Sequence, residues 1–195
     1  PYAEIVEALM QRMSAQQKIG QLLLVSFNGS DTSDTSAIAD LITNYHIGGV
    51  QLKASAQNFT NNSDGAAVPT QITELANSLQ RLAIRGESGI ETPEAVEAPT
   101  RTPRPSSPTV TPTLRIVAEP KSIPIFVGIA QENDLAANIE LPEMSSGVTL
   151  APNAMAIGAT WKPQNASSVG QIIGGELAQL GVNLYFGPAL DVMDT

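Results

Sequence analysis

Three carboxylate side chains follow short apolar stretches of the chain, at points where buried strands are expected to end. Glu132 and Asp134 follow the stretch 123–130, and Asp191 follows the stretch 182–190. Paired carboxylates can hydrolyse a glycosidic bond, as acid/base and nucleophile, when they lie about 5–5.5 Å apart. Carboxylates in loops are more often solvated and do no chemistry. The sequence therefore offers these three residues as candidates and leaves both interpretations open.

Two other polar residues stand at the ends of apolar stretches. Asn28 follows the stretch 22–27, and Lys53 follows the stretch 47–52. Parallel α/β folds place their functional sites at the carboxyl ends of strands, so both positions are also candidates. His46, the only histidine, precedes a strand instead. A structural role is therefore the favoured interpretation of His46.

Composition excludes several kinds of site. The chain has no cysteine, which excludes a disulfide framework, a thiolate nucleophile and a cysteine-ligated metal. Its net charge of −9 argues against nucleic acid as a partner, because binding to phosphates needs clustered Lys and Arg. No apolar stretch approaches the roughly 20 residues that a membrane-spanning helix needs.

The positions of strands and helices follow from hydrophobic periodicity. Four apolar stretches have the length of buried strands: 22–27, 47–52, 123–130 and 182–190. Four stretches have helical spacing or a helix cap: 14–24, 35–46, 69–84 and 165–181. Alternation of the two with short connections predicts a parallel sheet covered by helices. Half of a (β/α)8 barrel and a small doubly wound sheet both fit, because a full barrel takes about 250 residues.

Glycine pairs and glycosylation triplets carry little functional information. Gly48–Gly49 and Gly174–Gly175 lack the strand–loop–helix setting of a dinucleotide site, so they are interpreted as allowing close packing. Asn-x-Ser/Thr triplets would be modified only in a eukaryotic secretory pathway; they begin at Asn28, Asn58, Asn61 and Asn165.

A proline-rich segment divides the chain. Eight of the 14 prolines lie between Pro93 and Pro124. Such a segment buries too little apolar area to offset the entropy lost on ordering, so we expect residues 86–121 to be a linker or disordered insertion. An ordered surface loop is the alternative.

Six blocks of the sequence, taken together and in order, resemble a known family. They read "MSAQQKIGQLLLVSFNGS", "LITNYHIGGVQL", "QITELANSLQRLA", "IPIFVGIAQE", "APNAMAIGAT" and "VGQIIGGELAQLGVNLYFGPALDV". They are similar to the first half of the catalytic barrel of glycoside hydrolase family 3, in its β-N-acetylhexosaminidase-like branch. The resemblance covers about residues 9–85 and 123–194 and favours the half-barrel interpretation.

The resemblance implies retaining hydrolysis of a β-linked sugar, with no metal or organic cofactor. The aspartate nucleophile and the histidine–aspartate acid/base of this branch come from the second half of the barrel, and none has a counterpart here. We therefore expect no catalytic residue in this chain, and sugar contacts at Glu132, Asp134 and Asp191. The third strand of the family usually ends in Asp-Gln-Glu-Gly-Gly, whereas this chain has Ala130 in place of the aspartate. A methyl group cannot accept a hydrogen bond from a sugar hydroxyl.

The predicted organisation is one α/β barrel fragment. Residues 1–85 form the first βα units, residues 86–121 the insertion, and residues 122–195 the third and fourth units. We expect the remainder of the barrel to lie in a longer polypeptide, and the half barrel to be capable of self-association through its open face. A non-catalytic scaffold or carbohydrate-binding module is the alternative function. The Thr/Pro-rich segment and the lack of cysteine favour an extracytoplasmic location.

Overall fold

The structure is a computed structural model that describes residues 2–60, 67–86, 123–130, 149 and 152–188. Six helices lie in these residues: α1 (Tyr2–Arg12), α2 (Ala15–Gly20), α3 (Ala37–Thr43), α4 (Ala67–Gly86), α5 (Ala154–Ala159) and α6 (Pro163–Gln179). Four strands accompany them: β1 (Leu24–Ser26), β2 (Gly49–Leu52), β3 (Phe126–Ala130) and β4 (Leu184–Phe186). The insertion predicted at residues 86–121 lies outside the described residues, apart from Gly86 at the end of α4.

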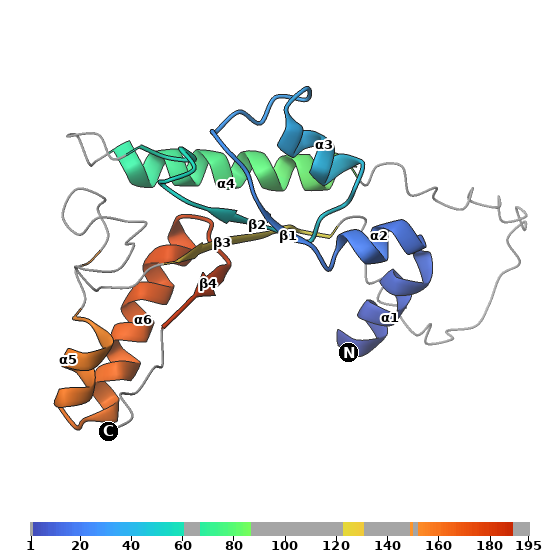
Figure 1. Ribbon diagram of the computed structural model, residues 1–195. Helices are drawn as coiled ribbons and strands as arrows, with labels where there is room; N and C mark the ends of the chain where they lie inside the picture. The colour runs from blue at the N-terminus through green and yellow to red at the C-terminus, as the bar shows by residue number, and fades with distance from the viewer. Residues whose placement is uncertain (1, 61–66, 87–122, 131–148, 150–151, 189–195) are drawn as a thin grey trace, which may run out of the picture.

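The four strands form one parallel sheet in the order β1-β2-β3-β4 (Figure 1). Val25 pairs with Val50, and Val50 pairs with Val127. One layer further along, Ile129 pairs with Tyr185. Sequential order with parallel pairing is the arrangement of consecutive βα units in a TIM-type barrel, so the predicted α/β fold is confirmed.

Local signals in the sequence fix several helix ends. Ser14 and Gln17 form a capping box at the start of α2, with each side chain bonded to the other residue's backbone N–H. Ser36 caps α3 by accepting from the Ala39 N–H. Gly181 follows α6 with a φ of 80°, the left-handed conformation that ends many helices.

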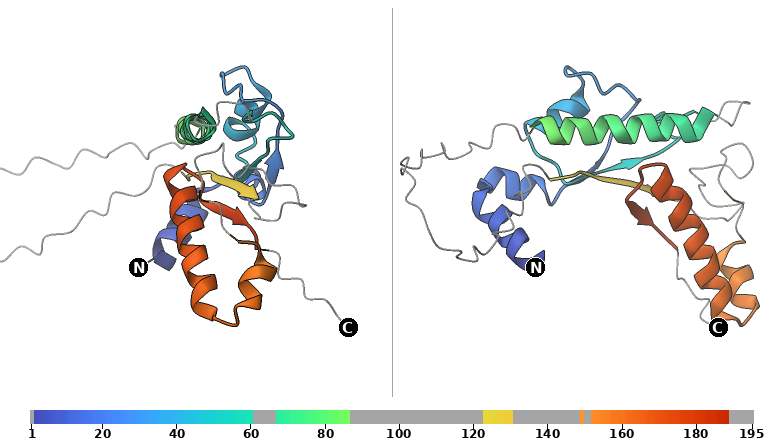
Figure 2. Two further views of the ribbon diagram at one scale, coloured as in Figure 1. Left: turned by 90° about the vertical axis from the view of Figure 1, so that its left-hand side faces the viewer. Right: turned by 180° about the vertical axis from the view of Figure 1, so that it is seen from behind.

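One face of the sheet is closed by helices. Val50, Leu52, Val127 and Ile129 are 0% exposed and pack in one cluster with the apolar stripe of α4 and the carboxyl-terminal half of α6. Figure 2 (left) shows α4 and α6 on the same side of β3 and β4. Burial of each such side chain contributes about 1.5–3 kcal/mol, so this face supplies most of the stability.

The opposite face of the sheet has little cover among the described residues. Leu24 is 42% exposed and Phe126 is 54% exposed, and Gly49 lies between them in register. The Phe186 ring lies over Gly128, since a Cβ on this glycine would approach Phe186 Cε2 to 2.5 Å. This surface, formed by Leu24, Phe126, Leu184 and Phe186, is called the inner face below.

Two helices were not predicted from the periodicity. In α1, the apolar residues Val6 and Met10 stay about half exposed, and no residue of the helix is fully buried. The helix α5 has only six residues, and Asn153 caps its start by accepting from the Ala156 N–H at 2.7 Å. Both helices lie beside the sheet and not across it (Figure 1).

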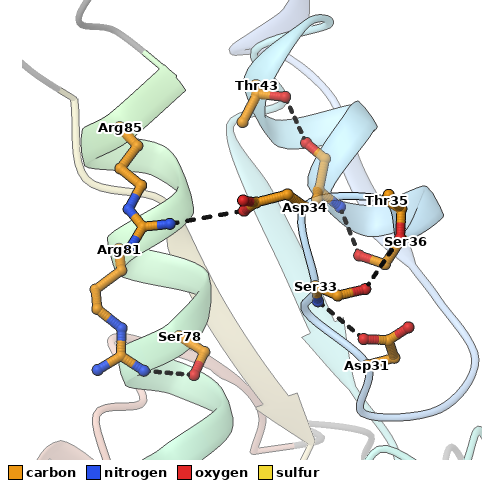
Figure 3. A network of polar contacts seen from close by, with 10 residues as sticks. Asp31, Ser33, Asp34, Thr35, Ser36, Thr43, Ser78, Arg81 and Arg85 are labelled. Carbon is orange, nitrogen blue, oxygen red and sulfur yellow. Dashed lines mark hydrogen bonds and ion pairs between the residues drawn. The ribbon is translucent and has the colours of Figure 1, made fainter.

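Polar contacts between α4 and the loop before α3 are confined to the surface. Figure 3 shows the ion pair between Arg85 of α4 and Asp34 of the loop, which spans 3.6 Å. It also shows Arg81 donating to Ser78 within α4, at 2.7 Å. The side chains of the ion pair are 68% and 81% exposed, and such pairs contribute about 1 kcal/mol or less. The packing of α3 on α4 therefore depends on apolar residues such as Ile38, Ile42 and Leu79.

Close backbone approach occurs at only one of the two glycine pairs. A Cβ on Gly48 would lie 2.1 Å from the Gln21 carbonyl oxygen, and one on Gly20 would lie 2.0 Å from the Tyr45 carbonyl oxygen. Gly174 and Gly175, by contrast, meet no described atom within 4 Å. The interpretation that the second pair allows close packing is therefore wrong for the described part of the chain, because these residues lie on the exposed side of α6.

Substitution of Gly48 by alanine should destabilise the chain strongly. The added methyl group would overlap a backbone oxygen that cannot rotate away, so we expect a loss of at least about 1–3 kcal/mol in the free energy of unfolding. Gly174→Ala is the matched control, and it should be neutral or stabilising by up to about 1 kcal/mol because alanine favours helix. Urea denaturation measures both variants, and equal stabilities would contradict the close approach.

Candidate functional site at the carboxyl ends of the strands

The carboxyl ends of β1 and β2 are joined by one buried side chain. Asn58 is 1% exposed and is the only fully buried polar residue in the part of the chain that the structure describes. Its Oδ1 accepts from the Lys53 N–H at 2.8 Å. Its Nδ2 donates to the carbonyls of Phe27 and Gly29, at 3.0 and 2.7 Å. The amide thus connects the loop after β1 to the residue after β2.

Main-chain contacts reinforce this connection. The Gly29 N–H donates to the Ala56 carbonyl at 2.8 Å, and the Gln57 N–H donates to Ala54 at 2.9 Å. Gly29 and Gln57 have φ values of 80° and 60°, which glycine adopts without strain and glutamine adopts rarely. The two loops therefore form one hydrogen-bonded edge at the end of the sheet.

Asn28 and Lys53, two of the sequence candidates, lie on this edge. Asn28 is exposed and Lys53 is half-buried. Ser26 pairs with Gln51 in the last layer of β1, so continuation of the register sets Asn28 opposite Lys53. Phe27 and Leu52 belong to the helix-covered side. Strand residues alternate between faces, and extension of that alternation beyond the ends of β1 and β2 assigns Asn28 and Lys53 to the side of the sheet that carries the inner face.

The predicted carboxylates lie outside the described residues. This holds for Glu132, Asp134 and Asp191 alike, so their role as sugar contacts stays a prediction. Ala130 is described and ends β3 in register with Phe186. The carboxyl end of β3 therefore presents a methyl group at the position where the resemblance expects an aspartate.

His46 lies at the opposite end of the sheet. It precedes β2 with a φ of 54°, and its carbonyl accepts from Gln21 Nε2 at 2.9 Å. Partial burial lowers the pKa of its imidazole below 6.5, because burial disfavours the charged form. These features fit the structural role expected for this residue.

Other ionisable groups of the described residues do not gather into a site. The pKa of Asp31 is lowered because its carboxylate accepts from the Ser33 N–H at 2.8 Å, in an exposed loop. Among the described residues, no cluster of three or more His, Asp or Glu side chains is placed to hold a metal ion. No described helix is long and apolar enough to cross a membrane.

Comparisons with known proteins agree with the fold. Residues 109–195 match the glycosyl hydrolase family 3 N-terminal domain. Beta-hexosaminidase A of Pseudoalteromonas piscicida is 26% identical, over 92% of this chain and 25% of that protein. A solved glycoside hydrolase family 3 beta-N-acetylglucosaminidase from Paenibacillus sp. str. FPU-7 is 27% identical with a TM-score of 0.61, over 92% of this chain and 25% of that one.

These matches confirm the resemblance to the N-terminal domain of glycosyl hydrolase family 3. The four-stranded parallel sheet accordingly has the arrangement of the first βα units of a TIM-type barrel. The chain spans about a quarter of the length of the two proteins it matches.

Asn58 is the residue of this site that the sequence interpretation missed. In the sequence it stands out only as the start of a glycosylation triplet, whereas in the structure its buried amide accepts one hydrogen bond and donates two. Its place a few residues after a predicted strand, next to Phe59, which is also buried, was the available signal. The partners Phe27 and Gly29 are 31 and 29 residues away in the chain, and no local pattern predicts such contacts.

The lowered pKa of His46 allows the burial of its imidazole to be tested by pH. A lowered pKa in the folded state means that the stabilisation from the neutral imidazole is complete above the unfolded pKa of about 6.5. It is lost as the pH falls through the folded pKa. NMR titration of the single histidine should give a pKa below 6.5, and His46→Asn, which tolerates the positive φ, should remove this part of the pH dependence. A measured pKa at or above 6.5 would contradict the burial of the ring.

Proposed function

We propose that this chain forms the first βα units of the catalytic barrel of a retaining β-glycosidase of the β-N-acetylhexosaminidase or β-glucosidase type. In this proposal it contributes to hydrolysis of O-glycosyl bonds only when further βα units complete the barrel. The observation that carries the proposal is the parallel sheet with one closed face and an apolar inner face, in which Phe126 is 54% exposed. The names of both similar proteins support the sugar class.

The inner face explains why completion is needed. Parallel sheets are stable when both faces are covered, and the interior of a TIM barrel is a packed layer of side chains from all eight strands. Leu24, Phe126, Leu184 and Phe186 would form part of those layers. Further βα units, or a second copy of this chain in self-association, would cover them.

The chemical groups are divided between this chain and the added units. The nucleophile and acid/base implied by the resemblance have no counterpart among these residues, so we assign them to the added units. Glu132, Asp134 and Asp191 would contact the sugar from this chain. The domain division follows: residues 1–85 and 122–195 belong to one barrel, and residues 86–121 are an insertion in it.

Ala130 favours a second candidate function. Without the expected aspartate at the end of β3, the site lacks a charged acceptor for sugar hydroxyls, and such hydrogen bonds contribute about 1.5–3 kcal/mol. The alternative is a non-catalytic scaffold or carbohydrate-binding module that has kept the fold.

A chimera tests the two functions against each other. Residues 1–195 replace the aligned quarter of the Pseudoalteromonas piscicida protein, and hydrolysis of an aryl β-N-acetylglucosaminide is measured for Ala130 and for Ala130→Asp. We expect no turnover by the isolated chain, measurable turnover by the Ala130→Asp chimera, and a rate roughly 10- to 150-fold lower with Ala130.

Controls make the outcome decisive. Val50→Asp, which places a charge in the closed core, should abolish turnover in the chimera by unfolding it. Turnover by the isolated chain that survives repurification and disappears in Asp191→Asn would contradict the need for completion. If the folded chimera binds the sugar but shows no turnover, both with Ala130 and with Ala130→Asp, the result would favour the non-catalytic alternative.

A further inference from the structure

The hydrogen bonds of Asn58 do more than satisfy a buried amide. The paired part of β1 ends at Ser26 and the paired part of β2 at Leu52. Beyond that point the Asn58 amide joins the segments that follow the two strands, through the Lys53 N–H and the carbonyls of Phe27 and Gly29. It therefore fixes the backbone on both sides of Asn28 and at Lys53.

The side chains presented by this edge match the chemistry of a sugar. The Lys53 ammonium carries three donors, and the Asn28 amide carries two donors and one acceptor oxygen. No hydrogen bond or ion pair engages either side chain within the described part of the chain. Sugar hydroxyls and the carbonyl of an acetamido group accept from such donors, and the Asn28 oxygen can accept from a hydroxyl or an acetamido N–H.

We propose that Asn28 and Lys53 form one wall of the sugar-binding site, and that Asn58 is the positioning residue for both. This inference rests on the proposed function and deepens it, because it assigns neutral N-acetylated sugars to a specific edge of the sheet. Neither side chain takes part in the bridge, which uses only main-chain atoms of Phe27, Gly29 and Lys53. Substitution of Asn28 or Lys53 therefore tests contact with the sugar, while substitution of Asn58 tests the order of the edge.

Hydrogen–deuterium exchange measured by mass spectrometry tests both parts on the full chain, whether it is monomeric or associated. The probe is methyl N-acetyl-β-glucosaminide at a saturating concentration. We expect added sugar to slow exchange severalfold in peptides that contain residues 27–30 and 53–58. Asn28→Ala and Lys53→Ala should each lose this protection while exchange without sugar stays as in the parent chain.

Asn58→Ala tests the positioning role. Without sugar, exchange of the Gly29 amide should rise by at least tenfold, and the sugar should give no protection. Asn44→Ala is the matched control, since Asn44 is exposed and its side chain donates to Asp40 Oδ1 at 2.7 Å, four residues away; it should change neither quantity. If Asn58→Ala unfolds the chain, the Asn28 and Lys53 variants still decide the sugar contact.

The outcomes separate this inference from the proposed function. Protection that is absent from both peptides, or unchanged in Asn28→Ala and Lys53→Ala, overturns the inference even if the chimera hydrolyses its substrate. Protection that is present and lost in the variants supports it even if the chimera is inactive, in which case the wall serves a binding module.

Discussion

A parallel sheet with one covered face is the constraint on which the rest of the structure depends. The helices α3, α4 and α6 share one buried cluster with Val50, Leu52, Val127 and Ile129, which are 0% exposed. The same alternation that sends these residues to the closed face sends Leu24, Phe126, Leu184 and Phe186 to the other side. Parallel sheets are stable when both faces are covered. The inner face has little cover among the described residues, and this is the basis of the proposal that further βα units or a second copy of the chain cover it.

The same geometry concentrates polar groups at one end of the sheet. Parallel strands all deliver their following loops to the carboxyl edge, which brings Asn28, Lys53 and Ala130 to neighbouring positions although they are far apart in sequence. The amino edge, by contrast, is occupied by the close backbone contacts of Gly20 and Gly48. The amino end of the sheet is thus closely packed, while polar side chains are accessible at the carboxyl end.

Much of the fold could be predicted because its signals are local. Continuous apolar stretches marked every strand, and Ser14 and Gly181 marked helix ends. Interactions that depend on distant partners were not predictable: the Asn58 bridge spans about 30 residues, and whether a glycine meets a backbone oxygen depends on a neighbouring loop. The helix α1, in which no residue is fully buried, was not among the predicted helices.

The candidate site was predicted in part. The sequence pointed to the strand ends, and the structure brings Asn28 and Lys53 together there, whereas the three carboxylates lie outside the described residues. The alternation of a strand assigns a face to each residue but does not identify the side chain that ties two loops together. Asn58 was identified because it is a buried polar residue, and burial is known only from the three-dimensional structure.

The open inner face is the central claim, and light scattering across a concentration series of the purified chain, with an apolar-surface dye present, measures it most directly. With an open inner face, we expect either association that grows with concentration or strong dye binding by the monomer. Mutation of Phe126 to Ser, which removes a half-exposed ring from that face, should weaken both. A compact monomer at every concentration, with cooperative unfolding and no bound dye, would contradict the account, because it would mean that the sheet closes on itself.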